Sequence, residues 1–205
     1  GKPMIVSTGG STMDEVQRAV DTIRGANSKT PIALLHCVSN YPTKPSDANL
    51  ACMATMEAAF NTVIGFSDHT VENATAIASV ALGAQVIEKH FTLDREQDGP
   101  DHQLSCDPAG LKALVDAARI AHQSVGRTEK SPVESDDFIP LIRRSVTAHV
   151  ALEAGTIITR EMLAVKRPGS GIQPDRLVDV VGMRTKRSLR LDETIGWDDV
   201  EGGSD

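Results

Sequence analysis

The sequence is poor in aromatic residues. Phe, Trp and Tyr together make up 3% of the 205 residues, with a single Trp and a single Tyr. Proteins that hold single-stranded nucleic acid stack its bases on aromatic rings, which this chain can hardly supply. A formal net charge of −7 also opposes binding to a phosphate backbone. We therefore expect no nucleic acid among the partners.

Cysteine and long apolar runs are scarce as well. Cys37, Cys52 and Cys106 are odd in number and have no Cys-x-x-Cys spacing, which argues against a disulfide framework. We find no signal peptide and no apolar run near 18 residues, so no membrane contact is expected. These features predict a reduced, cytoplasmic protein.

What the sequence does contain is a repeated strand–helix pattern. Apolar runs typical of buried parallel strands lie at 4–6, 31–38, 62–66 and 85–91, and helical periods follow at 13–25, 49–60, 71–82 and 108–125. Right-handed crossovers then give a curved parallel sheet with its helices outside. Polar residues follow every strand, as they do at the working end of an eight-unit barrel. Four units make half of such a barrel: either a complete half-barrel that pairs with another chain, or part of a longer protein, which we favour.

The periodicity stops after Gly126. Residues 127–142 are charged, contain proline and read as a linker. Beyond them, short β-type runs at 145–150, 162–166 and 188–191 alternate with turn signals. The fold class predicted is α/β, with a partial TIM barrel over 1–126, a linker over 127–142 and a small, mostly β domain over 143–205.

Two histidines stand at the ends of neighbouring predicted strands. His69 and His90 are 21 residues apart, and adjacent parallel strands lie about 4.8 Å apart, so both imidazoles can share one divalent metal. Asp68 and Asp101 are nearby carboxylates that can complete a mixed shell suited to Mn²⁺ or Mg²⁺. The alternatives are that each histidine only binds backbone or a carboxylate, and that Asp68 caps the next helix.

Other polar groups follow the strands. Ser7 and Thr8 open a Gly-Gly loop before a helix N-terminus, a suitable place for an anion. Each remaining candidate could either bind a ligand or serve only as a packing, charge-paired or solvated residue. These candidates are Ser39, Asn40, Tyr41, Glu88, Lys89 and, in a turn of the second domain, Arg167.

Five ordered segments of the chain, taken together, resemble the sialic acid synthase family, which includes N-acetylneuraminate synthases and related enzymes for legionaminic acid and spore-coat sugars. The segments are STGGST, LLHCVSNYP, IGFSDHT, IEKHFTLD with GPDH, and VKRPGSG, and the similarity runs over residues 2–201. The resemblance implies the four C-terminal units of a TIM barrel followed by an antifreeze-like (SAF) β-domain.

The resemblance also implies a reaction. Phosphoenolpyruvate would condense with an N-acylhexosamine such as N-acetylmannosamine, giving a nine-carbon 2-keto acid and phosphate. His69 and His90 match the family's metal ligands, with Asp101 beside them as a further catalytic residue. Related acceptors, as in legionaminic or pseudaminic acid synthesis, and a non-catalytic carbohydrate-binding subunit remain alternatives.

The family's binding residues can be matched to positions in this chain. Ser7 and Ser67 match positions that hold the phosphate and carboxylate of phosphoenolpyruvate, and Tyr41 and Asp101 match positions near the sugar. Arg167 matches an arginine that reaches the partner subunit's barrel, which implies a domain-swapped homodimer.

Two features depart from the family pattern. Ser39 stands where some members have an Asn near the phosphate. The family's phosphate-binding lysines and catalytic carboxylates lie on four strands that this sequence does not contain, so we expect the 205 residues alone to be inactive.

Overall fold

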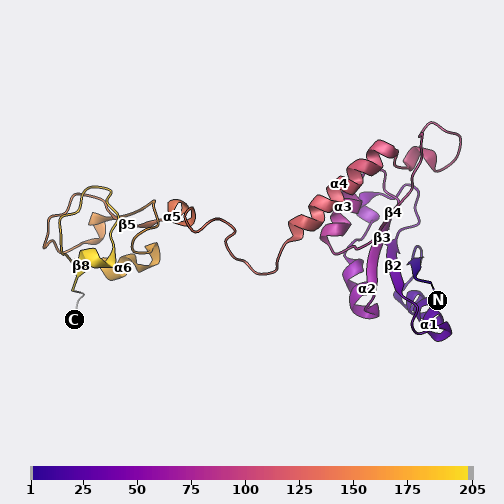
Figure 1. The fold of residues 1–205 in the computed structure, drawn as a ribbon, viewed down its shortest axis with the longest axis horizontal. Coiled ribbons are helices and arrows are strands. Elements are labelled where there is room, and N and C mark those ends of the chain that lie inside the picture. Colours follow the sequence, from indigo (N-terminus) through magenta and orange to yellow (C-terminus); the bar gives the residue numbers. More distant parts are fainter. Residues whose placement is uncertain (1, 203–205) are drawn as a thin grey trace. The chain divides into compact units, whose positions relative to one another are not determined.

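The computed structural model describes residues 2–202, and the chain divides into two compact units, residues 1–128 and 129–205 (Figure 1). The first unit is a parallel sheet with its crossover helices, and the second is a small β-rich unit. Each is described by itself.

The first unit contains a four-stranded sheet in the order β1-β2-β3-β4. Its strands are β1 (Met4–Ser7), β2 (Ile32–Cys37), β3 (Val63–Asp68) and β4 (Ile87–Lys89), and every neighbouring pair is parallel. The four predicted strands are thus confirmed, although β4 is shorter than its apolar run. Sequential parallel strands of this kind require the crossover helices that the periodicity predicted.

The sheet curls strongly. Ser7 on β1 donates a hydrogen bond to Glu88 Oε1 on β4 at 3.4 Å, although β2 and β3 lie between these strands. In a flat sheet three strand spacings would separate the two strands by roughly 14 Å. Odd-numbered residues of β1, β2 and β3 therefore face a concave interior, where Ile5 remains 62% exposed. This is the half-barrel expected from four strand–helix units.

The outer face of the sheet carries the core. Four helices follow the strands: α1 (Met13–Ala26), α2 (Cys52–Phe60), α3 (Ala74–Ala81) and α4 (Pro108–Val125). Val20 of α1 and Phe60 of α2 pack with Leu34 and Phe66 of the sheet in one buried cluster. Burial of such side chains contributes about 1.5–3 kcal/mol each, which holds the helices on this face. No described helix is long and apolar enough to cross a membrane.

Side-chain caps begin two of the four helices. Thr12 is the N-cap of α1 and forms a capping box with Glu15, whose pKa is lowered by hydrogen bonds from the Thr12 backbone and hydroxyl. Asp107 caps α4 by accepting a hydrogen bond from Gly110 N at 2.6 Å. The expected cap of α3 by Asp68 is wrong, because the N-cap position is Asn73 and makes no side-chain cap bond.

The second unit is built from two small antiparallel pairs. β5 (Ser145–Ala148) pairs with β6 (Leu163–Lys166), and β7 (Arg184–Thr185) pairs with β8 (Val200–Glu201). Short helices α5 (Ile139–Ile142) and α6 (Leu177–Val180) complete it around a cluster that includes Val146, Ile158 and Ile195. The strand expected at 188–191 is wrong, since only a single bridge forms there, between Leu152 and Leu189.

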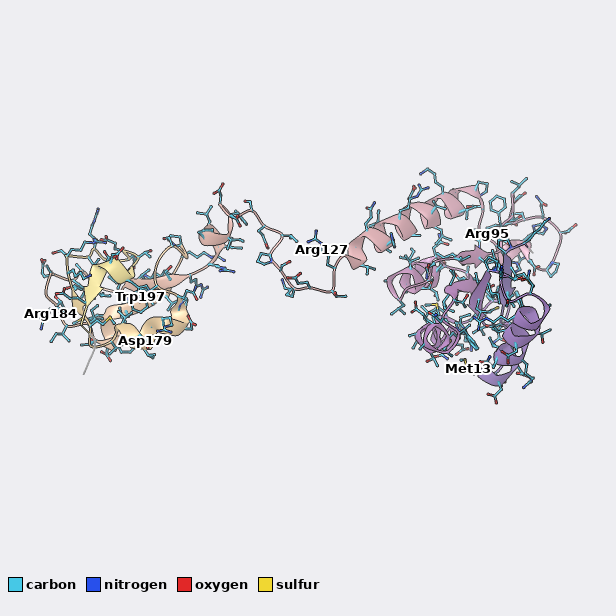
Figure 2. The ribbon with its side chains drawn as sticks, turned by 60° about the horizontal axis from the view of Figure 1, so that its bottom comes forward. Met13, Arg95, Arg127, Asp179, Arg184 and Trp197 are labelled. Atoms are coloured by element: carbon cyan, nitrogen blue, oxygen red, sulfur yellow. The ribbon has the colours of Figure 1, made fainter. Side chains whose placement is uncertain are left out.

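The segment predicted as a linker is irregular at first and then joins the second unit. Figure 2 shows Arg127 in the non-helical stretch that follows α4. Within the second unit, Gly169 N donates to Pro140 O at 2.6 Å. Helix α5, inside the expected 127–142 linker, is therefore fastened to the β-rich unit.

Candidate active site

Three aromatic rings meet at the carboxyl ends of β2, β3 and β4. The ring centroids of Tyr41 and His69 are 4.2 Å apart, those of His69 and His90 are 5.2 Å apart, and those of Tyr41 and His90 are 5.5 Å apart. Each residue follows a different strand, and the carboxyl ends of parallel strands converge. The predicted neighbourhood of the two histidines is therefore present.

His69 is held by backbone. Its ring is 6% exposed, and its Nδ1 lies 2.7 Å from Val38 O. Because a carbonyl oxygen only accepts, Nδ1 carries a proton, so Nε2 is the ring nitrogen that remains for another ligand. A hydrogen bond of this kind is what orients a metal-ligating imidazole. His69 Nε2 is therefore the nitrogen that could hold a cation, with the His90 ring beside it.

Asp101 joins the same cluster from the loop after β4. Its Oδ2 lies 3.8 Å from His90 Nδ1, and its side chain is 57% exposed. The loop that presents it is closed by the Phe91–Cys106 bridge and by two bonds from the Arg95 guanidinium to Gln103 O, at 3.1 and 2.6 Å. Figure 2 shows Arg95 in this loop. The geometry lets the Asp101 carboxylate reach a ligand placed beside His90.

Asp68 is not part of this cluster, contrary to the expectation of a mixed metal shell. Its Oδ2 accepts from Lys89 Nζ at 2.7 Å on the outer face of the sheet, with both side chains almost fully buried. Successive side chains of a strand point to opposite faces, so Asp68 must face away from His69. Within residues 2–202, no three His, Cys, Asp or Glu side chains are close enough together to hold a metal ion.

Two serines meet at a carboxylate on the concave face. Ser67 donates to Glu88 Oε1 at 2.8 Å, and Ser7 donates to the same oxygen at 3.4 Å. The two residues matched to the phosphoenolpyruvate site are therefore brought together. An anion binding both hydroxyls would meet the Glu88 carboxylate, so additional cations are needed to make such a site favourable. Glu88, a candidate for which the sequence also allows a paired interior charge, faces the concave side and accepts hydrogen bonds from both serines.

Ser39 lies against the glycine loop that follows β1. A Cβ placed on Gly9 would overlap Ser39 Oγ and lie 3.1 Å from Cys37 Sγ, so glycine allows Ser39 to keep this position. Thr8, which the anion hypothesis included, instead donates to Leu35 O at 2.8 Å and is buried. The exposed Ser39 hydroxyl therefore remains for a ligand, whereas the Ser7 hydroxyl already donates to Glu88.

The three cysteines are free thiols, of which Cys37 and Cys106 are buried. Burial raises the pKa of the Cys106 thiol, an effect that the nearby Lys89 charge partly offsets. Burial also raises the pKa of the Cys52 thiol. Both thiols therefore stay protonated and poorly nucleophilic at neutral pH.

Arg167 lies in the second unit. It is exposed, and its Nε donates to Ile142 O at 3.0 Å, which fixes the base of the guanidinium beside α5. The outer nitrogens project from this anchored base and suit a bidentate polar ligand. Its role toward another subunit stays a prediction.

Comparison with known proteins agrees with this architecture. The model of the NeuB family matches residues 1–130, and the model of the SAF domain matches residues 143–201. The N,N'-diacetyllegionaminic acid synthase of Legionella pneumophila is 40% identical over 97% of this chain and 57% of its own length. Human N-acetylneuraminate-9-phosphate synthase is 33% identical over 95% of this chain and 55% of its own length. The chain thus spans a little over half the length of these relatives.

A solved structure is similar to this chain over nearly its whole length. The spore coat polysaccharide biosynthesis protein SpsE of Bacillus subtilis is 32% identical and superposes with a TM-score of 0.57, covering 98% of this chain and 62% of that protein. The relatives named here are synthases or biosynthetic proteins of sugar polymers and acids. With its curled parallel half-barrel followed by a SAF domain, the chain belongs to the NeuB family.

Proposed function

We propose that this chain forms the C-terminal part of a synthase that condenses phosphoenolpyruvate with an N-acylhexosamine such as N-acetylmannosamine. C3 of phosphoenolpyruvate bonds to the aldehyde carbon of the open-chain sugar, water supplies the keto oxygen, and phosphate leaves. The observation that carries the proposal is the single concave site in which Tyr41, His69 and His90 stand beside Ser7 and Ser67.

Each residue has a stated task in this proposal. His69 and His90 hold a divalent cation, Mn²⁺ or Mg²⁺. When bound, that cation supplies a Lewis acid for the sugar carbonyl. Ser7, Ser67 and Ser39 donate hydrogen bonds to the phosphate and carboxylate, while Tyr41 offers an aromatic face and Asp101 accepts from sugar hydroxyls. Arg167 grips the N-acyl group from a second subunit, which makes the working form a domain-swapped homodimer.

The acceptor has a second candidate. Identity is higher to the legionaminic acid synthase, at 40%, than to the human N-acetylneuraminate-9-phosphate synthase, at 33%. A six-deoxy diacetamido sugar is therefore the alternative acceptor, with the same bond-forming chemistry. A non-catalytic carbohydrate-binding subunit is the alternative from another class, and the Ser7 and Ser67 hydroxyls already bound by Glu88 favour it if no further cations join the site.

The test is phosphate release from phosphoenolpyruvate with Mn²⁺ and each sugar. We would assay the 205 residues alone and joined to the part of the Legionella pneumophila relative that they do not match. We expect release only from the joined chain, only with sugar and metal, and none from its His69→Ala variant. Phosphate release with the diacetamido sugar alone would identify that sugar as the acceptor. No release with either sugar would contradict the synthase and favour the carbohydrate-binding subunit. Turnover by the 205 residues alone would contradict the expected inactivity.

A further inference from the structure

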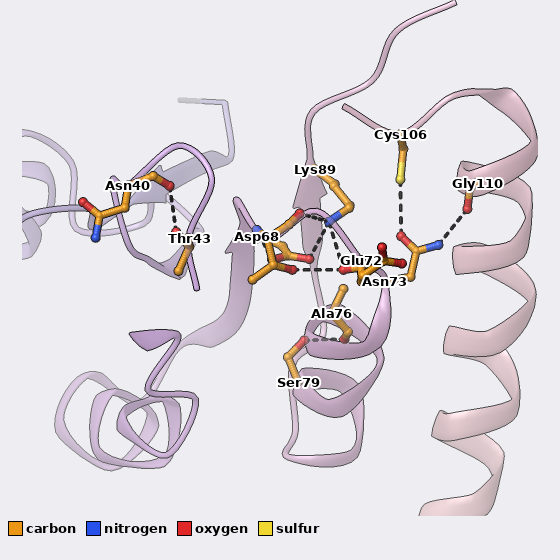
Figure 3. A network of polar contacts seen from close by, with 11 residues as sticks. Asn40, Thr43, Asp68, Glu72, Asn73, Ala76, Ser79, Lys89, Cys106 and Gly110 are labelled. Carbon is orange, nitrogen blue, oxygen red and sulfur yellow. Dashed lines mark hydrogen bonds and ion pairs between the residues drawn. The ribbon is translucent and has the colours of Figure 1, made fainter. Parts of the chain in front are cut away.

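A buried ion pair lies directly behind the two histidines. Lys89 Nζ and Asp68 Oδ2 are 2.7 Å apart, and the side chains are 2% and 0% exposed. Figure 3 shows the pair between β3, β4 and the loop that leads to α3. Charges are taken out of water at a high desolvation cost, so a pair this deep demands several compensating contacts.

Lys89 makes those contacts with the loop that carries His69. Its ammonium donates to Thr70 O at 2.7 Å and to Glu72 O at 3.4 Å, in addition to Asp68. Asp68 Oδ1 in turn accepts from Thr70 N at 2.9 Å. The Lys89 ammonium therefore binds residues 68, 70 and 72 at once, and His69 lies within the segment that it holds together.

The register of β3 against β4 places the ion pair one residue before the two histidines. Ser67 pairs with Glu88, and Asp68 pairs with Lys89, so His69 and His90 follow as the next residues of the two strands. Side chains of a strand alternate between the two faces of the sheet. The ion pair therefore lies on the outer face, and the imidazoles of the next residue on each strand lie on the inner face. A shift of either strand end would move one ring relative to the other.

The loop of His90 is tied into the same network. Cys106 N donates to His90 O at 2.8 Å, and Cys106 Sγ donates to Asn73 Oδ1 at 3.3 Å. Asn73 Nδ2 also donates to Gly110 O in the first turn of α4 at 2.9 Å (Figure 3). The backbones around both histidines are thus joined through Lys89 on one side and through Cys106 and Asn73 on the other.

We propose that Asp68 and Lys89 are positioning residues that fix the separation and orientation of the His69 and His90 rings. Neither touches a ligand in the concave site; they act through the backbone of residues 68–72 and the end of β4. The consequence for cation affinity rests on the proposed function, whereas the ring geometry does not.

The test uses a variant that removes the tie without leaving a lone buried charge. Asp68→Leu/Lys89→Met replaces the pair by apolar groups of similar size, an exchange that proteins often tolerate. Asp68→Asn/Lys89→Met is the substitute if the first variant does not give a native-like unfolding transition. Lys112→Met, which breaks the exposed pair with Asp116 on α4, is the matched control.

The first measurement is nuclear magnetic resonance of the imidazoles in the metal-free 205-residue chain. The native chain and Lys112→Met should show the His69 Nδ1–H signal and cross-relaxation between the His69 and His90 rings. In the folded double variant we expect that cross-relaxation to be lost and His69 to exchange between tautomers. A folded double variant with both native signals would overturn the proposal.

The second measurement is Mn²⁺ binding by titration calorimetry. Loss of an outer partner of metal-binding residues weakens affinity by about 10- to 100-fold, and we expect a loss of that order in the double variant only. Unchanged affinity in a folded double variant would overturn the proposal. If the native chain and His69→Ala bind Mn²⁺ equally weakly, the metal site of the proposed function fails, while the altered ring signals still support positioning.

Discussion

At the scale of single residues, Gly9 allows Ser39 to approach closely because glycine has no side chain. Gly9→Ala would place a methyl group on Ser39 Oγ and 3.1 Å from Cys37 Sγ. Overpacking typically costs about 1–3 kcal/mol, and the lower end applies here because the exposed Ser39 hydroxyl can rotate away from the methyl group. We expect the free energy of unfolding to fall by that amount, measured by urea denaturation.

A second substitution separates this clash from a general effect of alanine. Gly9→Ala/Ser39→Ala removes the hydroxyl that the methyl group meets, while the Ser39 Cβ stays at an ordinary 3.5 Å. The double variant should regain most of the lost stability. A double variant as unstable as Gly9→Ala would show that the backbone at Gly9, and not Ser39, sets the cost.

The sequence predicts which residues lie near the site, but not on which face of the sheet each side chain lies. His69, His90 and Asp101 were placed together because strand ends converge, and the structure confirms that neighbourhood. The prediction of Asp68 as a metal ligand is wrong. A carboxylate next to a histidine resembles a ligand in the sequence, and only the register of β3 against β4 shows that it pairs with Lys89. That register, once seen, pairs Asp68 with Lys89 and leaves Glu88 to the serines.

At the scale of elements, the start of α4 depends on one cap. Asp107 Oδ1 accepts from Gly110 N at 2.6 Å, and Gly110 O receives the Asn73 amide that ties α4 to the loop before α3. Replacing an N-cap Asp by Ala costs about 1 kcal/mol. We expect Asp107→Ala to lower the free energy of unfolding by that amount, as measured in urea.

The matched variant for this cap is Asp107→Ser, because serine also accepts a hydrogen bond from the first turn. It should remain within a few tenths of a kcal/mol of the native chain, since good caps are nearly interchangeable. If serine destabilises the chain as much as alanine does, the contribution of Asp107 is its charge and not its cap.

Element type was predictable where the apolar period was long. Strands of the first unit and their helices follow from apolar runs of three to eight residues and from faces that repeat every 3.6 residues. The second unit was harder, because β7 and β8 have two residues each and carry no period to detect. At 188–191, Leu189 is buried but forms only a single bridge, and Leu191 already lies in a turn, so the apolar residues there indicate core and not a strand.

At the scale of the whole molecule, the chain's two units have separate cores. Buried residues of the first unit gather between the sheet and α1 and α2, whereas those of the second unit surround β5 and β6. The only Trp of the sequence, Trp197, belongs to the second unit and is labelled there in Figure 2. Its fluorescence therefore reports the unfolding of that unit within the intact chain.

In the second unit Arg187 forms ion pairs with two carboxylates, whose contribution to stability depends on pH. The guanidinium lies 2.7 Å from both Glu193 Oε1 and Asp199 Oδ1. The pKa of Glu193 is lowered, first by the hydrogen bond from Arg190 N and then by Arg187. For Asp199, burial raises the pKa, but the hydrogen bonds from Arg187 and from Gly196 N outweigh it, and the net direction is downward.

A lowered carboxylate pKa fixes the sign of the pH effect. Stability from these groups is fully present above the unfolded-state pKa of about 4 and is lost as the pH falls toward the lower folded-state values. We expect Arg187→Met to lower the melting temperature seen by Trp197 at pH 7, and the gap to the native chain to shrink between about pH 5 and pH 2. Arg176→Met, which breaks an exposed pair with Asp179, should cost little at any pH, since such pairs are worth at most about 1 kcal/mol. A gap for Arg187→Met that stays constant down to pH 2 would show that the arginine acts through packing of its stem, and not through the two carboxylates.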